Sequence, residues 1–304
     1  GSALRSTAER AARLEQVRVR SDGDAADATE PRFGQAQSRR FAPASLSLAA
    51  RRDLGAGWQA SATVGSTQRA PAYYELYANG VHVATAAFEK GDASLPLERS
   101  RHVELGLAWR QGAHAVQAHV FSTRFASFMA LDATGADVVV PGEDGQPDSS
   151  VPEYAFRAVR ARMSGLEIEG RTHWVVGAWT LDGTASLDTV RGDNLDAGQP
   201  LPRLAPVRLR LALEAGAGHW TAGLALRHQA AQNRVPATDT ATPGATLVDL
   251  WAQGRFTASG SLLWFAKLTN LGDRVATNAG AVATVRGLSP QGGRALQMGL
   301  QWRL

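Results

Sequence analysis

The sequence predicts an all-β protein, an antiparallel transmembrane β-barrel of about 12 strands. Three observations predict it: apolar and polar residues alternate along many segments, tight turns alternate with long polar connections, and tryptophans stand near segment ends. In a β-strand, successive side chains point to opposite faces, so an alternating segment has one apolar and one polar face. A membrane barrel requires this pattern, because lipid contacts only its outer face.

The alternation is clearest in segment 98–111, where Val103 and Leu105 share one parity and His102 and Glu104 share the other. The predicted strands are 13–21, 40–53, 57–69, 98–111, 113–129, 155–173, 174–190, 202–216, 218–232, 245–257, 260–271 and 293–304. Many of them exceed the ~5–6 residues of a typical globular strand. They are long enough to cross a bilayer, which takes ~9–11 tilted residues.

The connections between these segments alternate in length. Tight turns are predicted at 54–56, 112, 216–218 and 258–260, and long polar connections at 70–97, 130–154, 191–201, 233–244 and 272–292. Outer-membrane barrels have short turns at one end and long loops at the other. The tryptophans near strand ends suit an aromatic girdle at the membrane interface: Trp58, Trp109, Trp174, Trp220 and Trp302. A soluble β-sandwich or propeller is the alternative, and it predicts folding without detergent.

The composition excludes several kinds of chemistry. The 304 residues include no cysteine, which excludes disulfides, thiolate metal sites and cysteine nucleophiles. The arginines are scattered between apolar residues, so nucleic acid is not an expected partner. No enzyme motif is present, and His119 and Ser122 fall on opposite faces of one strand. The chain is therefore not expected to be an enzyme or to hold a catalytic cofactor.

The two ends of the chain differ from its middle. Residues 1–39 form an N-terminal segment with one candidate strand at 13–21 and a polar loop at 21–38, although Ser6 and Thr7 could instead begin a short helix. Residues 40–304 form a single barrel domain. Gly299, Trp302 and Leu304 give a glycine followed by two apolar residues at alternate positions. That pattern resembles the terminal strand by which outer-membrane proteins are recognised for barrel insertion, which more often ends in Phe.

Nine segments from residue 69 onward carry a family resemblance. They are RAP at 69–71, YYELYANGVHVAT at 73–85, FEKGD at 88–92, LERSRHVELG at 97–106, GLEIEGR at 165–171, LPRLAPVRLR at 201–210, TLVDLWA at 246–252, LTNLGDR at 268–274 and VRGLSPQGGR at 285–294. In this order they resemble the C-terminal half of the barrel of TonB-dependent outer-membrane receptors. The subgroup they resemble most is associated with zinc and other metals.

The resemblance implies a receptor in the bacterial outer membrane that takes up a metal ion or metal complex, most plausibly zinc. Its partners would be outer-membrane lipid, the barrel assembly machinery and, only through a plug that this chain lacks, TonB. About 12 strands would then be the C-terminal portion of a barrel of about 22. One alternative is a self-contained 12-stranded pore or translocator barrel. A second alternative is a TonB-dependent siderophore or haem receptor.

The connection at 70–97 is the candidate ligand site, because it is longer than compact domains usually tolerate without a function. Imidazole and carboxylate are suitable zinc ligands, so His82 with Glu89 or Asp92 is the predicted metal site. The other predicted residues of this ligand loop are Tyr73, Tyr74, Glu75, Tyr77 and Asn79. Alternatively, His82 fixes the loop by hydrogen bonds and the carboxylates are solvated. A hydrophilic barrel lining explains His102 and Glu104 without a metal.

Overall fold

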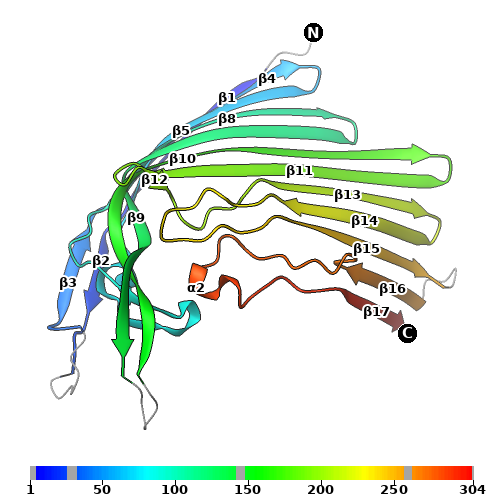
Figure 1. Cartoon of the computed structure of the whole chain (residues 1–304). Coiled ribbons are helices and arrows are strands. Elements are labelled where there is room, and N and C mark those ends of the chain that lie inside the picture. Colours follow the sequence, from blue (N-terminus) through cyan, green and yellow to red (C-terminus); the bar gives the residue numbers. More distant parts are fainter. Residues whose placement is uncertain (1–4, 26–32, 142–147, 257–261, 303–304) are drawn as a thin grey trace.

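A single curved antiparallel sheet dominates the computed structural model, which describes residues 5–25, 33–141, 148–256 and 262–302 (Figure 1). Within these ranges, 12 strands follow one another in the order β1-β4-β5-β8-β9-β10-β11-β13-β14-β15-β16-β17. Strands β1 and β17 are the two edges, so the sheet is an arch rather than a closed barrel. The prediction of an all-β antiparallel barrel fold is confirmed, and the chain forms part of a barrel.

The strands of the arch are long at its centre and shorter toward the C-terminal edge. Their bounds are β1 Ser6–Leu14, β4 Ala44–Gly55, β5 Trp58–Arg69, β8 Glu98–Gln111, β9 His114–Val140, β10 Ser149–Val176, β11 Trp179–Asn194, β13 Arg208–Ala217, β14 Trp220–Gln229, β15 Ala245–Arg255, β16 Leu262–Thr269 and β17 Ala295–Trp302. The short β12 (Gln199–Pro200) pairs with β11. Among the described residues, no helix has the length and apolar character needed to cross a lipid bilayer.

Strand β1 replaces the helix start that Ser6 and Thr7 suggested, and that interpretation is wrong. The strand pairs with β4 from Ser6↔Arg52 to Leu14↔Ala44. Alanine-rich sequence has no strong strand preference of its own, so the free edge of β4, which offers backbone partners, decides the conformation. The predicted strand at 13–21 is also interrupted, because β1 ends at Leu14 and β2 begins at Val17.

The prediction of a polar connection at 130–154 is wrong as well. There β9 and β10 continue as a paired hairpin, from Ala130↔Arg157 to Val140↔Ser149, and its tip at 142–147 lies outside the described residues. The β-branched residues Val138, Val139 and Val140 favour a strand. The predicted turn at 258–260 also lies outside the described residues.

Tight turns lie at 56–57, 112–113 and 218–219, and each shares one residue with the turn predicted at 54–56, 112 or 216–218. The turn after β10 is at 177–178, so Trp174 belongs to β10 rather than to the following strand. The tryptophans gather at this turn end of the sheet. Trp58 and Trp109 have ring centroids 6.3 Å apart, and those of Trp220 and Trp264 are 5.0 Å apart.

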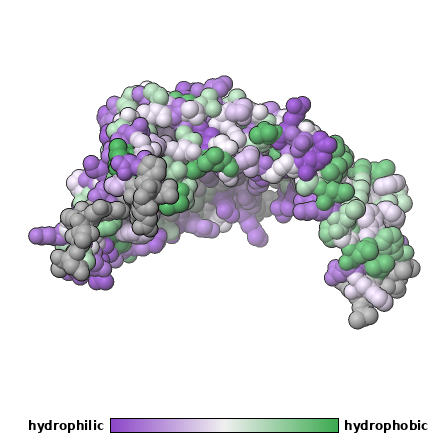
Figure 2. All heavy atoms as spheres, turned by 60° about the horizontal axis from the view of Figure 1, so that its bottom comes forward, coloured by the Kyte–Doolittle hydropathy of each residue, from purple (hydrophilic) through white to green (hydrophobic). Residues whose placement is uncertain are grey.

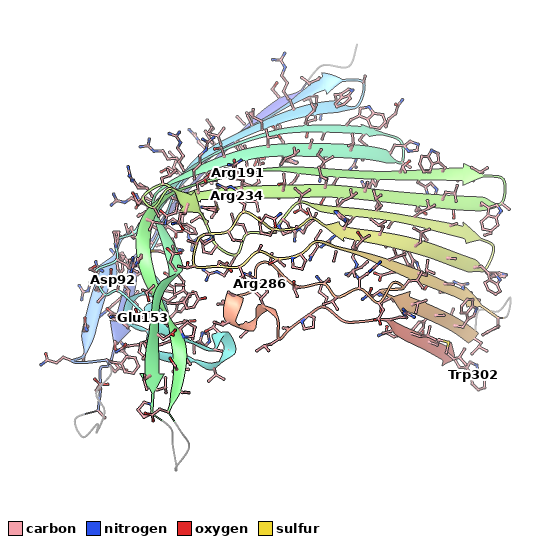
Figure 3. All side chains as sticks on the ribbon, viewed as in Figure 1. Asp92, Glu153, Arg191, Arg234, Arg286 and Trp302 are labelled. Atoms are coloured by element: carbon pink, nitrogen blue, oxygen red, sulfur yellow. The ribbon has the colours of Figure 1, made fainter. Side chains whose placement is uncertain are left out.

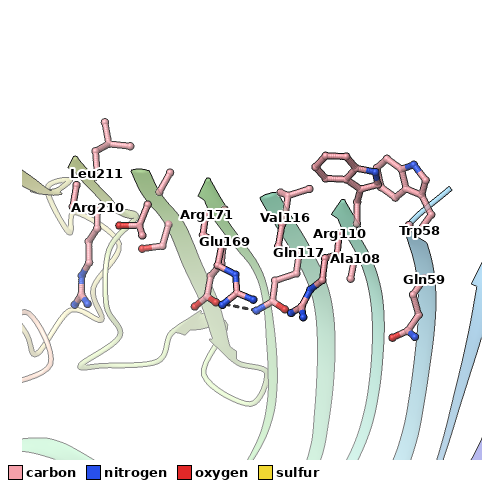
Figure 4. A pocket seen from close by; sticks show the side chains of 18 of the residues that line it. Trp58, Gln59, Ala108, Arg110, Val116, Gln117, Glu169, Arg171, Arg210 and Leu211 are labelled. Atoms are coloured by element: carbon pink, nitrogen blue, oxygen red, sulfur yellow. Dashed lines mark hydrogen bonds between the residues drawn. The ribbon is translucent and has the colours of Figure 1, made fainter. Parts of the chain in front are cut away.

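The two faces of the arch differ in polarity. Figure 4 shows Trp58, Val116 and Leu211 on one side of the sheet, and charged and amide side chains such as Arg110, Gln117 and Arg210 on the other. On the outer face, Leu105 is 55% exposed and Leu300 is 71% exposed. Large exposed apolar surfaces are rare on soluble proteins, and a membrane barrel places such a surface against lipid. In Figure 2 the same arch is seen with its hollow underneath.

The buried apolar core lies at the loop end of the sheet rather than inside the arch. Strands β2 (Val17–Ser21) and β3 (Gln37–Phe41) form a separate two-stranded sheet beside the long hairpin of β9 and β10 (Figure 1). With helix α1 (Tyr73–Tyr77) they form what we call the loop-end core. Its members are Val19, Phe41, Leu76, Leu95, Met129 and Phe156.

Arg69 ties this core to the arch. Its guanidinium contacts both oxygens of Glu75, at 2.8 and 3.0 Å, and both oxygens of Glu98, at 3.2 and 3.0 Å. Glu75 also accepts a hydrogen bond from the backbone N–H of Ala72 at the start of α1, and Glu98 accepts one from the N–H of Met129. One guanidinium therefore joins the end of β5 to α1, β8 and β9.

We expect Arg69→Gln to loosen the loop-end core. It would leave two carboxylates with 7% and 17% exposed side chains without their cation. Breaking a fully buried pair costs ~3–5 kcal/mol, and the 42% exposure of Arg69 reduces our expectation to about 2 kcal/mol. Faster proteolysis of residues 73–92 in the variant than in the unaltered protein would show the loosening of this core. Arg101→Gln, at an exposed position on β8, is the control, and equal proteolysis of both variants would contradict the proposed role.

We expect Gly165→Ala to destabilise the sheet, because a Cβ there would lie 2.5 Å from the carbonyl oxygen of Thr189 and from the Phe121 ring. The backbone oxygen is fixed by its strand and cannot shift easily. Overpacking of this kind lowers the free energy of unfolding by ~1–3 kcal/mol. The midpoint of guanidinium unfolding in detergent measures it. Gly170→Ala on the same strand meets nothing closer than 4.0 Å, and should leave that midpoint unchanged. Equal midpoints for the two variants would refute the clash.

Candidate functional site

The connection after β5 lies at the loop end of the arch, which we call its mouth. In chain order, α1 is followed by β6 (Asn79–His82), the 3-10 turn η1 (Val83–Thr85) and β7 (Ala87–Lys90). Strands β6 and β7 form a hairpin, and Ala86 at its bend has a positive φ of 47°. Strand β7 then pairs in parallel with β10, with Phe88 opposite Glu153. The hairpin is thereby held against the sheet by backbone hydrogen bonds.

His82 and Glu89 meet across this hairpin. The Nδ1 atom of His82 lies 2.9 Å from Oε1 of Glu89, and the hydroxyl of Thr85 donates to the same oxygen at 2.9 Å. The imidazole is 55% exposed, whereas the carboxylate is 11% exposed. Because Nδ1 of His82 faces the carboxylate, Nε2 is the ring nitrogen that remains to bind a ligand. The pair is an exposed imidazole held by a mostly buried carboxylate.

Asp92 has different partners from the other two predicted metal ligands. Its Oδ1 accepts hydrogen bonds from the N–H of Ser94 at 2.8 Å and from the hydroxyl of Ser94 at 2.6 Å. Figure 3 shows Asp92 at the loop end, beside the long hairpin. In the described ranges, no three His, Asp or Glu side chains gather closely enough to hold a metal ion. The structure thus joins His82 to Glu89 and leaves Asp92 to cap a turn.

The predicted ligand-loop residues divide into exposed and supporting ones. Tyr73 and Tyr74 are exposed and pack edge to face with ring centroids 5.5 Å apart. Glu75 is buried against Arg69. The hydroxyl of Tyr77 is buried without a hydrogen-bond partner in the described structure, and Asn79 lies opposite Lys90 in the hairpin. Only the first two tyrosines present a broad surface to a ligand.

Residues that sequence reasoning missed fasten the other loops to this hairpin. Helix α2 (Ala283–Arg286) lies in the connection after β16. Arg286 forms a 3.0 Å ion pair with Asp239 in which both side chains are 7% exposed, and Thr284 donates a hydrogen bond to the carbonyl of Thr85. Figure 3 shows Arg286 within the arch. No spacing in the sequence links these positions, which stand about 50 and 200 residues apart.

Two ionisable groups near this mouth have shifted pKa values. Both belong to the loop-end parts of β9 and β10, beyond the last residues that β9 pairs with β8. Burial raises the pKa of Asp132, although Arg203 and Arg157 oppose the shift. Burial and the nearby Asp239 raise the pKa of Tyr154. The mouth is therefore a partly desolvated polar region in which charges interact strongly.

The inner face carries a large hollow toward the turn end, with a volume of about 1020 Å³ (Figure 4). Its polar lining includes Arg110, Arg171, Arg210 and a hydrogen-bonded pair in which Gln117 donates to Glu169 at 2.9 Å. These side chains come from β8, β9, β10 and β13. A hydrophilic wall of this kind suits the water-filled or plugged interior of a large barrel.

Two of the predicted barrel-insertion residues, Gly299 and Trp302, lie on β17, the C-terminal edge of the sheet. Gly299 stands opposite Phe265, and a Cβ there would come within 2.4 Å of its ring. Trp302 pairs with Leu262 and is 72% exposed at the turn end (Figure 3). Leu304 lies outside the described residues.

Comparison with solved structures shows the same fold in several larger proteins. They include the copper transporter OprC (TM-score 0.75, 21% identity, 98% of this chain and 45% of that chain), the FrpB iron transporter from Neisseria meningitidis (0.64, 14%, 97% and 43%), and a mutant of the ferric enterobactin receptor PfeA from Pseudomonas aeruginosa (0.59, 15%, 98% and 53%). The chain spans about half the length of these proteins. At these identities the similarity establishes the fold alone.

The family comparison covers most of the chain. Residues 9–271 match the family described as TonB dependent receptor-like, beta-barrel. This range runs from β1 to the end of β16 and includes the His82–Glu89 hairpin. The chain therefore belongs to the β-barrel family of the TonB-dependent receptors.

Proposed function

We propose that this chain is the barrel part of a bacterial outer-membrane receptor for a metal ion or metal complex, and that zinc is its cargo. Members of the family are transporters rather than enzymes. The observation that carries the proposal is the contact of 2.9 Å between His82 and Glu89 at the mouth of the arch. Outer-membrane lipid would cover the outer face, and the barrel assembly machinery would insert the sheet. TonB would act on the receptor through its plug rather than through this barrel part.

The His82–Glu89 pair fits zinc by its chemistry. Zinc accepts imidazole nitrogen and carboxylate oxygen, and sites that exchange ligands keep positions open for water. The half-exposed ring of His82 can meet an ion from outside, while Thr85 holds the carboxylate in place. Glu89 would hold the ring through Nδ1 while Nε2 of His82 binds the ion. So few protein ligands bind an ion weakly, which suits a receptor that must release its cargo. The solved structures of similar fold include copper and iron transporters, which supports a metal cargo of some kind.

A ferric siderophore or haem is the second candidate cargo. The observation that favours it is the exposed pair of Tyr73 and Tyr74, because flat aromatic rings stack on large organic ligands. The self-contained pore is not favoured, since β1 and β17 do not pair with each other among the described strands. The two cargo candidates use different residues of one connection, so they can be tested separately.

We expect His82→Ala and Glu89→Gln each to weaken zinc binding by roughly tenfold or more, as the loss of groups around metal sites commonly does. The measurement is calorimetric titration of Zn²⁺ into the natural polypeptide that contains this chain, purified in detergent. Asp92→Asn is the matched control, because Asp92 caps a turn apart from the pair, and it should bind zinc as the unaltered protein does.

Unchanged zinc affinity in both His82→Ala and Glu89→Gln would overturn the zinc proposal. Tyr73→Ala combined with Tyr74→Ala should then be titrated with a ferric catecholate complex. Loss of binding there, with the His82→Ala variant unaffected, would assign the cargo to the second candidate.

A further inference from the structure

A carboxylate on the inner face lies between two imidazole rings. On β8, Glu104 has Oε1 3.5 Å from Nδ1 of His119 and Oε2 3.8 Å from Nε2 of His102. Both separations exceed the length of a hydrogen bond between such atoms. The three side chains are each about one-third exposed, so they are reachable from the inside of the arch.

Both rings are held in place by their surroundings. The Nδ1 atom of His102 lies 2.9 Å from the hydroxyl of Thr123, which leaves Nε2 directed at Glu104. His119 stands directly opposite Gly106, and a Cβ at position 106 would lie 2.9 Å from its Nδ1 and Cε1 atoms. The glycine thus lets the imidazole lie across β8 toward the carboxylate.

The separation between His119 and Glu104 suits a bound ion. Zinc bonds nitrogen and oxygen at ~2.0–2.1 Å, so two atoms 3.5 Å apart can both reach one ion at an angle of about 115–120°, close to tetrahedral. The 3.8 Å contact of His102 requires a wider angle of about 135°. The ion therefore fits best on the His119 side, between Nδ1 of His119 and Oε1 of Glu104.

A third ligand is available on the next strand. Glu167 lies directly opposite His119 on β10, and it has no hydrogen bond or ion pair among the described residues. No three such side chains converge on one point in the described conformation, so Glu167 has to rotate to complete the site and water fills the remaining positions. Such a site is weak. Weak binding is what a site along a transport path requires, because a bound ion must also leave the site.

We propose that Glu104 and His119, with Glu167 as third ligand, form an inner site for a divalent transition-metal ion. The inference rests on the proposed metal cargo and adds to it a second station inside the arch, on β8 to β10. The ion would meet His82 and Glu89 at the mouth first and the inner site next.

The test uses the natural polypeptide in detergent, titrated with Zn²⁺ by calorimetry and with Co²⁺ by visible absorption, which reports low-coordinate cobalt. We expect two ions per chain. His119→Gln and Glu104→Gln should each remove one ion and weaken the inner site by about tenfold or more, and Glu167→Gln should have a smaller effect. His114→Gln is the matched control, because His114 is on the same strand but on the outer face, bonded to Thr172.

The outcomes separate this inference from the proposed function. His82→Ala should remove the outer ion and keep the cobalt absorption of the inner one. If His119→Gln and Glu104→Gln leave stoichiometry and absorption unchanged, the inner site is refuted, whatever His82→Ala does. If the inner ion binds but the unaltered protein takes up no zinc in cells, the proposed function fails while the site stands. Heat-modifiable migration on gels verifies that each variant is folded.

Discussion

The structure depends on one constraint: in lipid, a backbone N–H or C=O group finds no water, so each strand must bond to neighbouring strands along its length. The register satisfies this constraint for the arch strands from β4 to β16, which have antiparallel neighbours on both sides, whereas the edge strands β1 and β17 are paired on one side among the described residues. Pairing in turn fixes which side chains share a face, because opposite residues point the same way. The polar inner wall and the apolar outer face both follow from this rule, and so does the inner group of His102, Glu104 and His119.

The loop end obeys a different rule. Water can reach the backbone there, so the chain no longer needs to remain in the sheet and folds into a small core of its own. The core needs a fixed attachment, and Arg69 supplies it by pairing with Glu75 and Glu98 at once. The His82–Glu89 hairpin is attached twice, through β7 on β10 and through Thr284 on η1. The candidate site therefore lies on a hairpin that is held at two points, although it belongs to a long connection.

Sequence reasoning predicts the arch well and the loop end poorly, for a physical reason. Alternation reports the period of a strand, so the faces of β8 or β17 are predicted from parity alone. It does not report which strands meet outside the sheet, so the parallel pairing of β7 with β10 and the contact of Arg286 with Asp239 have no signal. The sequence does carry one signal for the position of His119. The tight turn at 112–113 makes β8 and β9 partners at equal distances from it, which places His119 opposite Gly106.

The glycine opposite His119 belongs to a device that recurs across the sheet. Glycines 106, 165, 223 and 299 each stand opposite a ring, respectively His119, Phe121, Trp251 and Phe265, that lies where a Cβ would clash. A ring that covers a cross-strand glycine stabilises the sheet, so packing alone explains the position of His119. The polar atoms of His119 distinguish it from the other three rings. The Nε1–H of Trp251 donates to Glu214 at 3.0 Å and is satisfied, whereas Nδ1 of His119 stops 3.5 Å from Glu104. The same packing device leaves one nitrogen and one oxygen at the spacing that a metal ion would close.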